Sequence, residues 1–256
     1  EELKEQRKVK FAYMPKFSII IPVYRPVPKY FTDMIKSIKH QTYSNWEICI
    51  ADGGGEGHTV DKTLFGLVKG DKVRYVAISE NLGISGNTNV CFSMATGNFI
   101  GLFDHDDVMH PSLLFECVKT VCEKDADYVY TDEATFTSPN LDDLIVLHFK
   151  PDYSPDNLRA NNYICHFSMF DADLLKKTGL FRSEYDGSQD HDMILRLTDR
   201  AQKIVHVPRL MYYWRSHAGS TAASIDAKPY AIEAAKGAVA DHLKKHGFKH
   251  FQITST

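Results

Sequence analysis

The sequence predicts an α/β fold built on a mostly parallel β-sheet with helices on both faces. Apolar, β-branched segments alternate along the chain with segments whose apolar residues recur at helical spacing. The apolar segments are continuous rather than alternating, which is typical of strands buried on both faces of a parallel sheet. A length of 256 residues with 43% hydrophobic residues is enough for one large domain with a sizeable core.

The first half of the chain alternates regularly between the two kinds of segment. The run FSIIIP at 17–22 predicts the first strand, and 29–40 carries apolar residues at helical spacing after Pro28, which suits a first helical turn. Further strands are expected at 46–51, 73–78 and 98–103, and further helices at 85–95 and 111–123.

The second half is less regular. Strands are expected at 127–130, 163–170, 204–207 and 210–214, and helices at 190–198 and 226–246. We expect a charged N-terminal extension at 1–15, either a truncated linker or a helix, then one domain at 16–225 and a C-terminal helix and tail at 226–256. The charged start suggests a domain of a longer chain, so further domains of a parent protein are expected partners.

Composition excludes several classes of protein. A formal net charge of -3 gives no excess of basic residues that would favour nucleic acid as a partner. The sequence has neither an apolar run of the roughly 18 residues that span a bilayer nor a signal peptide. Five cysteines without a CxxC pair indicate buried free thiols in a reducing cytoplasm.

An acidic cluster follows the expected strand at 98–103. Asp104, Asp106 and Asp107 lie within four residues, with His105 among them. Their mutual repulsion calls for a cation, and carboxylate oxygens suit a hard divalent ion such as Mn²⁺ or Mg²⁺. The alternative is a solvated acidic loop in which Asp107 caps a helix. Ligands of parallel sheets bind beyond the carboxyl ends of the strands, where Asp52 also falls.

The strand with this cluster resembles the DxD region of nucleotide-sugar glycosyltransferases, and SIIIPVY at 18–24 resembles the first strand of glycosyltransferase family 2. The resemblance implies a GT-A fold, with a nucleotide-binding half at 16–107 and an acceptor half at 108–225. It also implies that Pro22, Val23 and Tyr24 line the base pocket. Asp52 matches the last Asp of the family's DDGS turn and would accept a hydrogen bond from the pyrimidine.

Two segments extend the donor side. NLGISGNTN resembles the family's NxGxSxARN segment and assigns Asn81, Gly83 and Asn87 to donor binding, although Asn87-Thr88 replaces the Ala-Arg pair. In the DxD region the resemblance places Asp104 at the ribose, with His105 also on the donor, and makes Asp106 a ligand of the metal.

The catalytic base is expected at the start of the helix at 190–198. GSQDHD resembles the family's EDxxLxxR region, with Gln189 in place of Glu on the acceptor side, and implies that Asp190 is the base of an inverting transfer. Asp192 is a rival candidate. The alternative is that both carboxylates only stabilise the helix N-terminus. The preceding loop at 180–188 is a hypothetical lid over bound donor.

A last motif, WRSHAGST, resembles the WRxHxGST segment of bacterial surface-polysaccharide transferases. It implies that His217 contacts the metal or a phosphate and that Arg215 pairs with the diphosphate. Trp214 is assigned to the acceptor side. Asp132 and His166, in or beside other stretches that fit this subgroup, are also expected there.

Together these resemblances predict an inverting, metal-dependent transfer of sugar from UDP-sugar, or next dTDP-sugar, to a hydroxyl of a glycan or lipid-linked glycan. We expect a cytoplasmic enzyme of bacterial surface polysaccharide synthesis, with peripheral contact at the inner face of the membrane as an option. One alternative is a catalytically silent nucleotide-sugar-binding module. Another is a metal-dependent phosphohydrolase, for which His191-Asp192 gives a superficial match but whose fold is all-helical.

Overall fold

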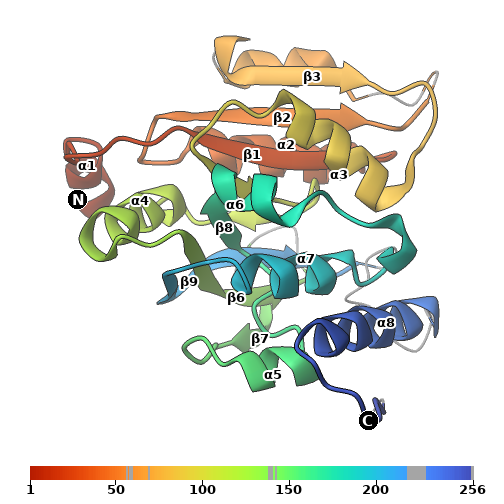
Figure 1. Cartoon of the computed structure of the whole chain (residues 1–256). Coiled ribbons are helices and arrows are strands. Elements are labelled where there is room, and N and C mark those ends of the chain that lie inside the picture. Colours follow the sequence, from red (N-terminus) through yellow and green to blue (C-terminus); the bar gives the residue numbers. More distant parts are fainter. Residues whose placement is uncertain are drawn as a thin grey trace.

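The computed structural model describes residues 1–256 except 56, 58–59, 69, 138–140, 142, 218–228 and 255–256. Its centre is one nine-stranded sheet in the order β3-β2-β1-β4-β8-β6-β9-β5, with β7 paired to β6. Figure 1 shows β3, β2 and β1 stacked at one end of the molecule and the C-terminal helix α8 toward the other. This mixed α/β architecture confirms the predicted fold class and excludes an all-helical phosphohydrolase.

The first half forms the expected parallel sheet. Its strands are β1 (Phe17–Val23), β2 (Trp46–Asp52), β3 (Val73–Ala77) and β4 (Phe99–Leu102), and β1 lies between β2 and β4. Every residue of β1 and β2 is buried, as their continuous apolar runs predict. The helices of this half are α2 (Pro28–Lys39) and α3 (Gly83–Met94).

The second half introduces antiparallel pairing. Strand β8 (Ser168–Asp171) is antiparallel to both β4 and β6 (Tyr128–Phe136), whereas β9 (Ile204–Arg215) is parallel to β6. The two strands expected at 204–207 and 210–214 form one continuous strand. The pairing register with β6 shifts between Val207 and Leu210, so Pro208 is accommodated within the strand. Two short strands, β5 (Val108–Met109) and β7 (Leu144–His148), were not expected.

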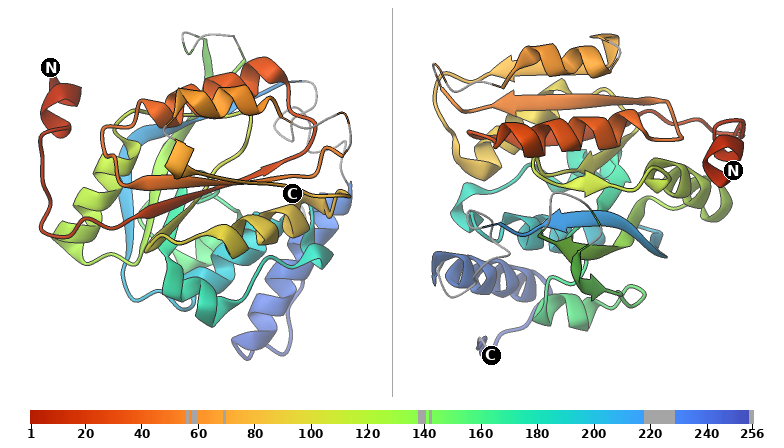
Figure 2. Two further views of the ribbon diagram at one scale, coloured as in Figure 1. Left: turned by 90° about the horizontal axis from the view of Figure 1, so that it is seen from above. Right: turned by 180° about the vertical axis from the view of Figure 1, so that it is seen from behind.

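Helices cover both faces of the sheet (Figure 2). Apolar residues of α2 and α4 (Leu113–Lys124) join one core. Those of α3, α6 (Ala172–Thr178), α7 (Gln189–Thr198) and α8 (Pro229–Lys245) join the other. Shorter elements complete the described chain: α1 (Glu2–Gln6), α5 (Pro155–Ala160), and the 3₁₀ turns η1 (Lys62–Leu67), η2 (Gly70–Lys72) and η3 (Ser183–Tyr185). Within the described ranges, no helix is both long and apolar enough to cross a membrane.

The N-terminal extension packs on this domain. The hydroxyl of Tyr43 donates to the carbonyl of Pro15 at 2.7 Å, and that of Thr42 donates to the side chain of Gln6 at 2.8 Å. The ring of Phe11 lies 5.2 Å from that of Phe115 in α4.

A buried carboxylate ties the parallel strands together. Glu47 on β2 is 1% exposed and accepts hydrogen bonds from Ser18 Oγ at 2.7 Å and from the amide of Thr96 at 2.7 Å. It also pairs with Lys16 Nζ at 2.6 Å and Arg74 Nε at 2.7 Å. Burial alone would raise the pKa of Glu47, but these donors outweigh it and lower the pKa to about 2.

We therefore predict that Glu47→Gln lowers the free energy of unfolding at pH 7 by about 2–3 kcal/mol. A lowered folded-state pKa contributes stability above the unfolded-state pKa of roughly 4.5 and loses it as pH falls toward 2. Urea unfolding should thus show a gap between wild type and variant at pH 7 that narrows below pH 4, with Glu80→Gln as an exposed control. Equal stability at pH 7 would contradict this account.

Candidate functional site

The predicted donor residues gather at the carboxyl ends of neighbouring parallel strands. Asp52 is the last residue of β2, and Asp104–Asp107 follow β4, with β1 between these two strands. Pro22 and Val23 end β1 and are buried, whereas Tyr24 just beyond is 44% exposed. The sheet order therefore places these segments along one edge, as the sequence predicted.

Asp52 holds the loop that follows β2. Its side chain is fully buried and accepts hydrogen bonds from the amides of Gly54 at 2.9 Å and Val60 at 2.8 Å, and from the hydroxyl of Tyr75 at 3.0 Å. Both carboxylate oxygens of Asp52 thus already accept hydrogen bonds from other groups of the protein. This structural task was not foreseen from the sequence, which assigned Asp52 only to the base.

The segment before α3 packs against the same loop. Asn87 Nδ2 donates to Asn81 Oδ1 at 3.0 Å, and the amide of Gly83 donates to the same oxygen at 3.2 Å. A Cβ on Gly53 would lie 2.8 Å from Asn87 Nδ2, so the two segments are in close contact. The polar residues of NLGISGNTN therefore border the turn after Asp52.

The three carboxylates after β4 have different surroundings. Asp107 is fully buried and accepts hydrogen bonds from the hydroxyl of Tyr212 and from the amide of Arg215, the latter at 2.7 Å. Asp106 Oδ2 lies 2.8 Å from His217 Nε2. The side chain of Asp104 is 42% exposed, and desolvation with the nearby charge of Asp106 raises its pKa to about 6, although His105 opposes the rise.

Asp106 and His217 fit a divalent ion. Two ligand atoms 2.8 Å apart can bind one metal, and a carboxylate oxygen with an imidazole nitrogen suits Mn²⁺. Asp104, two residues before Asp106, adds a third carboxylate to this loop beside Asp106 and Asp107. The rest of the WRSHAGST motif, residues 218–221, lies outside the described residues.

Arg215 has a different environment from the expected one. Its guanidinium is buried, donates from Nε to the carbonyl of Asp106 at 2.7 Å and lies 3.4 Å from the carboxylate of Asp33. It also packs between the rings of Tyr30 and Phe136 at 4.4 and 4.5 Å. In this structure the guanidinium supports the backbone of the acidic loop, and the expected pairing of Arg215 with a diphosphate stays a prediction.

His166 connects the acidic loop to the acceptor half. Its Nε2 lies 3.7 Å from Asp104 Oδ2, and its ring stacks on Tyr212 at 4.9 Å. Trp214 meets the same ring edge-on at 5.7 Å. The structure thus brings together His166, Trp214 and Asp104, which the sequence assigned to two sides of one site.

Asp190 is the second residue of α7 and lies near enough to His166 and Asp104 for their charges to act on it. Desolvation raises its pKa to about 6; the charge of His166 opposes this rise and that of Asp104 adds to it. Gln189 Nε2 donates to Asp190 Oδ2 at 3.3 Å. A carboxylate that responds to both His166 and Asp104 shares their site, and this pKa leaves it ionised at neutral pH.

Asp192, the rival candidate, is engaged elsewhere. Its side chain is 1% exposed and pairs with Arg182 Nη2 and with Arg196, whose Nη2 lies 2.7 Å away. Arg196 also donates to the carbonyls of Thr178 and Leu180 at 3.0 and 2.9 Å. Asp192 therefore anchors α7 to the preceding loop.

A buried ion pair behind His166 was missed by sequence reasoning. Lys150 Nζ lies 3.1 Å from Glu133 Oε2 and donates to the carbonyls of Ile164, at 2.6 Å, and His166. Glu133 in turn accepts from the amide of His166 at 3.2 Å. The only signal in the sequence is that TDE at 131–133 and FKPD at 149–152 each place a charged residue in the acceptor half.

Asp132, next to this pair, is 2% exposed. It lies 2.7 Å from His206 Nε2 and accepts from the amide of Lys150 at 2.9 Å. Asp132 thus has two partners within the protein, and its expected place on the acceptor side stays a prediction.

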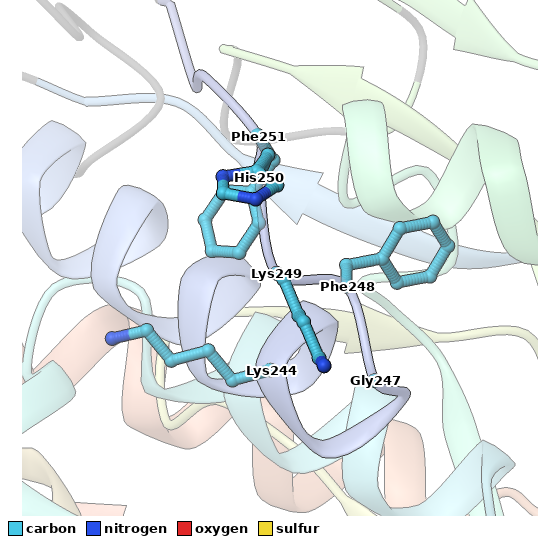
Figure 3. Close-up of a pocket in the computed structure, with 6 residues that line it drawn as sticks. All are labelled: Lys244, Gly247, Phe248, Lys249, His250 and Phe251. Atoms are coloured by element: carbon cyan, nitrogen blue, oxygen red, sulfur yellow. The ribbon is translucent and has the colours of Figure 1, made fainter.

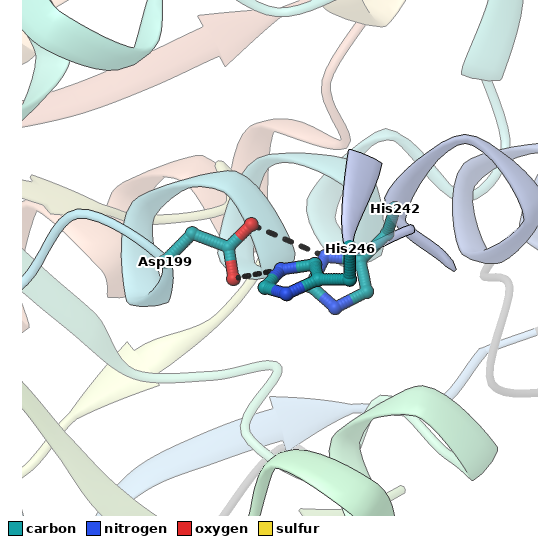
Figure 4. A group of neighbouring side chains, drawn as sticks. All are labelled: Asp199, His242 and His246. Carbon is teal, nitrogen blue, oxygen red and sulfur yellow. Dashed lines mark hydrogen bonds and ion pairs between the residues drawn. The ribbon is translucent and has the colours of Figure 1, made fainter. Parts of the chain in front are cut away.

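A second cluster of possible metal ligands joins α7 to α8. Asp199 lies 2.9 Å from His246 Nε2 and 3.3 Å from His242 Nδ1 (Figure 4). Arg159 Nε points at His242 Nε2 at 3.2 Å, and because arginine can only donate, that nitrogen must accept. A metal-bound histidine instead donates from its second nitrogen. The contacts fit a chain of ion pairs better than a metal centre.

A surface hollow near the C-terminus also lies apart from this chemistry. It is lined by Lys244 and residues 247–251, with their side chains splayed around the turn after α8 (Figure 3). Because one continuous segment forms it and none of the acidic residues above lines it, we give it no catalytic role.

The sequence is similar to those of two bacterial proteins. The chain is 39% identical over 90% of its length to the uncharacterized protein y4gI of Sinorhizobium fredii and 26% identical over 94% to the O-antigen biosynthesis protein RfbC of Myxococcus xanthus. It covers only 26% and 19% of those two proteins.

The fold matches solved glycosyltransferase structures. For S. aureus TarS 1-349 in complex with UDP-GlcNAc the TM-score is 0.68 at 18% identity, covering 90% of this chain and 72% of that one. For the mannosyltransferase PcManGT of Pyrobaculum calidifontis, in complex with GDP-Man and Mn²⁺, the TM-score is 0.60 at 16% identity, covering 98% and 82%. The family model for glycosyl transferase family 2 matches residues 18–179. With more than half of its length matched, this chain belongs to glycosyl transferase family 2.

Proposed function

We propose that this glycosyltransferase moves a sugar from a nucleoside-diphosphate donor to a glycan hydroxyl, with metal assistance and inversion at the anomeric carbon. One observation carries the proposal. Asp104, after β4, lies 3.7 Å from His166, and Asp190, in the first turn of α7, is near enough to both for their charges to act on its pKa. A donor-side acid cluster and an opposing base are what a single displacement requires.

On the donor side, Asp106 and His217 would hold Mn²⁺ or Mg²⁺, which supplies Lewis-acid stabilisation of the departing diphosphate. Asp104 and His105 would contact the donor beside it. Asn81, Gly83 and Asn87 would border the nucleotide on the other side of the turn after Asp52. We propose UDP first, because the TarS complex contains UDP-GlcNAc, and dTDP second.

The base pocket would lie at the end of β1. Pro22 and Val23 are buried there beside the loop that Asp52 holds, and the exposed ring of Tyr24 lies next to them in the chain. Asp52 would fix this pocket through its loop, and a direct bond to the pyrimidine would use its remaining lone pairs.

On the acceptor side, Asp190 would take the proton of the attacking hydroxyl while the oxygen bonds to the anomeric carbon. Trp214 and His166 offer an aromatic surface for the acceptor, and Gln189 orients the base. We propose a glycan or lipid-linked glycan as acceptor, in cytoplasmic polysaccharide synthesis, because the RfbC protein is named for O-antigen biosynthesis. Other domains of a longer chain would supply further contacts.

We predict that Asp106→Asn weakens metal-assisted UDP binding by at least about 10–100-fold, the loss typical even for residues that only support metal ligands. Isothermal titration with UDP, with and without Mn²⁺, measures the effect. Asp71→Asn, an exposed carboxylate in η2, is the control. Unchanged manganese-dependent affinity in Asp106→Asn would remove Asp106 from the metal site.

We predict that Asp190→Asn lowers the rate of sugar transfer by about 10²–10⁴-fold, the usual contribution of a general base. UDP and Mn²⁺ affinities should stay at the wild-type level because Asp190 lies on the acceptor side. A product assay with a panel of UDP-sugars measures transfer. A wild-type protein that binds UDP and manganese yet transfers no sugar would instead be a silent binding module.

The pH dependence follows from the raised pKa of Asp190, about 6. A base must be ionised, so kcat at saturating donor and Mn²⁺ should rise about tenfold per pH unit below 6 and level off above it. Donor binding measured at each pH separates this effect from loss of metal. A kcat that stays constant between pH 5 and 7 would show that Asp190 is not the titrating base.

A further inference from the structure

The loop before α7 is fastened to α3 at more than one place. The backbone of Phe181 exchanges two hydrogen bonds with the side chain of Asn89, and nearer to α7 the loop is held by the carboxylate of Asp186. Asp186 Oδ1 accepts hydrogen bonds from both the amide, at 3.3 Å, and the hydroxyl of Ser85 in the first turn of α3. The residue before this helix, Leu82, has no side chain that can cap it. Asp186 therefore caps α3 from a segment about 100 residues away in the sequence, and its negative charge suits the helix N-terminus.

Gly83 makes room for this contact. A Cβ at this position would lie 2.7 Å from Asp186 Oδ2, and the glycine adopts a φ of +75°. Both features restrict the position to glycine, so the turn into α3 is shaped to receive the carboxylate. The resemblance to the family segment explains the glycine only as part of donor binding, and the structure adds this second reason.

A short series of contacts leads from Asp186 to Asp190. The amide of Gly187 donates to Gln189 Oε1 at 2.8 Å, and Gln189 Nε2 donates to Asp190 Oδ2. The carboxamide of Gln189 thus connects the backbone next to Asp186 with the carboxylate of the proposed base. The orientation of Asp190 therefore depends on where the Asp186–Gly187 peptide is held.

Helix α8 fixes the opposite side of the segment. Ser188 Oγ donates to the carbonyl of Ala231 at 2.7 Å, and a Cβ on Gly187 would lie 2.6 Å from the ring of Tyr230. The segment is therefore held between α3 and α8. Asp186 supplies the α3 side of this support.

We propose that Asp186 is a positioning residue that couples the donor half to the catalytic base through Gln189. This inference rests on the proposed function, because it assigns Asp190 as the base. Asp186 lies in the loop at 180–188 that the sequence suggests as a hypothetical lid, and it fastens this loop to α3 in the structure. A helix cap alone would affect stability, whereas a positioning residue also sets kcat.

The test is a double-mutant cycle on kcat with Asp186→Ala and Gln189→Ala. We expect each single variant to lower kcat at least about tenfold while the dissociation constants of UDP and Mn²⁺ stay unchanged. Because both act through one connection, the double variant should be little worse than either single variant. Asp186→Asn, whose amide oxygen can still accept from Ser85, should restore most of the activity. Glu184→Gln, an exposed carboxylate in the same turn, is the control.

Two results would overturn the inference. One is a double variant whose loss of kcat equals the product of the losses in the two single variants, which would mean that Asp186 and Gln189 act independently. The other is an Asp186→Ala protein with lowered thermal stability but full kcat. Either result with an active wild type and an inactive Asp190→Asn variant leaves the proposed function standing. A wild type without transferase activity would overturn both.

Discussion

Mutual repulsion among the carboxylates at the end of β4 is the constraint around which the site is arranged. The protein relieves it differently at each residue. Asp107 is buried and accepts hydrogen bonds from the hydroxyl of Tyr212 and the backbone amide of Arg215. Asp106 lies next to His217. Asp104 retains a raised pKa beside them. In the proposed function, a divalent ion would offset the negative charge of the carboxylates and of the diphosphate that it binds.

Buried polar groups also support the backbone of the acidic loop and of the segment that carries His166. The guanidinium of Arg215 donates hydrogen bonds to the backbone carbonyl of Asp106 and to the carboxylate of Asp33. Lys150 and Glu133 fasten the backbone that presents His166. Such pairs are costly to bury and costly to break, which makes them suitable for fixing the position of nearby groups.

Two acids on one helix illustrate how environment assigns roles. Asp190 and Asp192 are two residues apart in the first turn of α7. Asp192 is paired with two arginines, so its charge is fully used inside the protein. Asp190 has Gln189 as its hydrogen-bond donor and a pKa raised to about 6. An ionised carboxylate with a raised pKa is a better proton acceptor than one that is neutralised by ion pairs.

The parallel half of the fold could be predicted because local signals suffice there. The run FSIIIP and the acidic cluster after β4 are each readable within a dozen residues. The strand pairing of the second half could not be predicted, although strands were expected there, since β8 and β9 take their places through partners far away in sequence. Strand β7 was missed although it is apolar: its residues 144–147 are each about half exposed, against the usual expectation for such a run.

The site divides in the same way. Motifs located Asp104, Asp106 and Asp190, because the spacing of chemical groups is visible in sequence. They could not show the surroundings of Asp132 and Arg215, because hydrogen-bond partners such as His206 and Asp33 come from other elements. The sequence identified the candidate side chains, but it could not show which of them form hydrogen bonds or ion pairs within the protein.

The most direct test of the account is a crystal structure with UDP-sugar and Mn²⁺, read at the manganese absorption edge. The account predicts an anomalous peak in bonding contact with the carboxylate of Asp106 and with the diphosphate, and Asp190 facing the anomeric carbon from the other side. Manganese at Asp199 and His246, or a nucleotide remote from the end of β4, would contradict it.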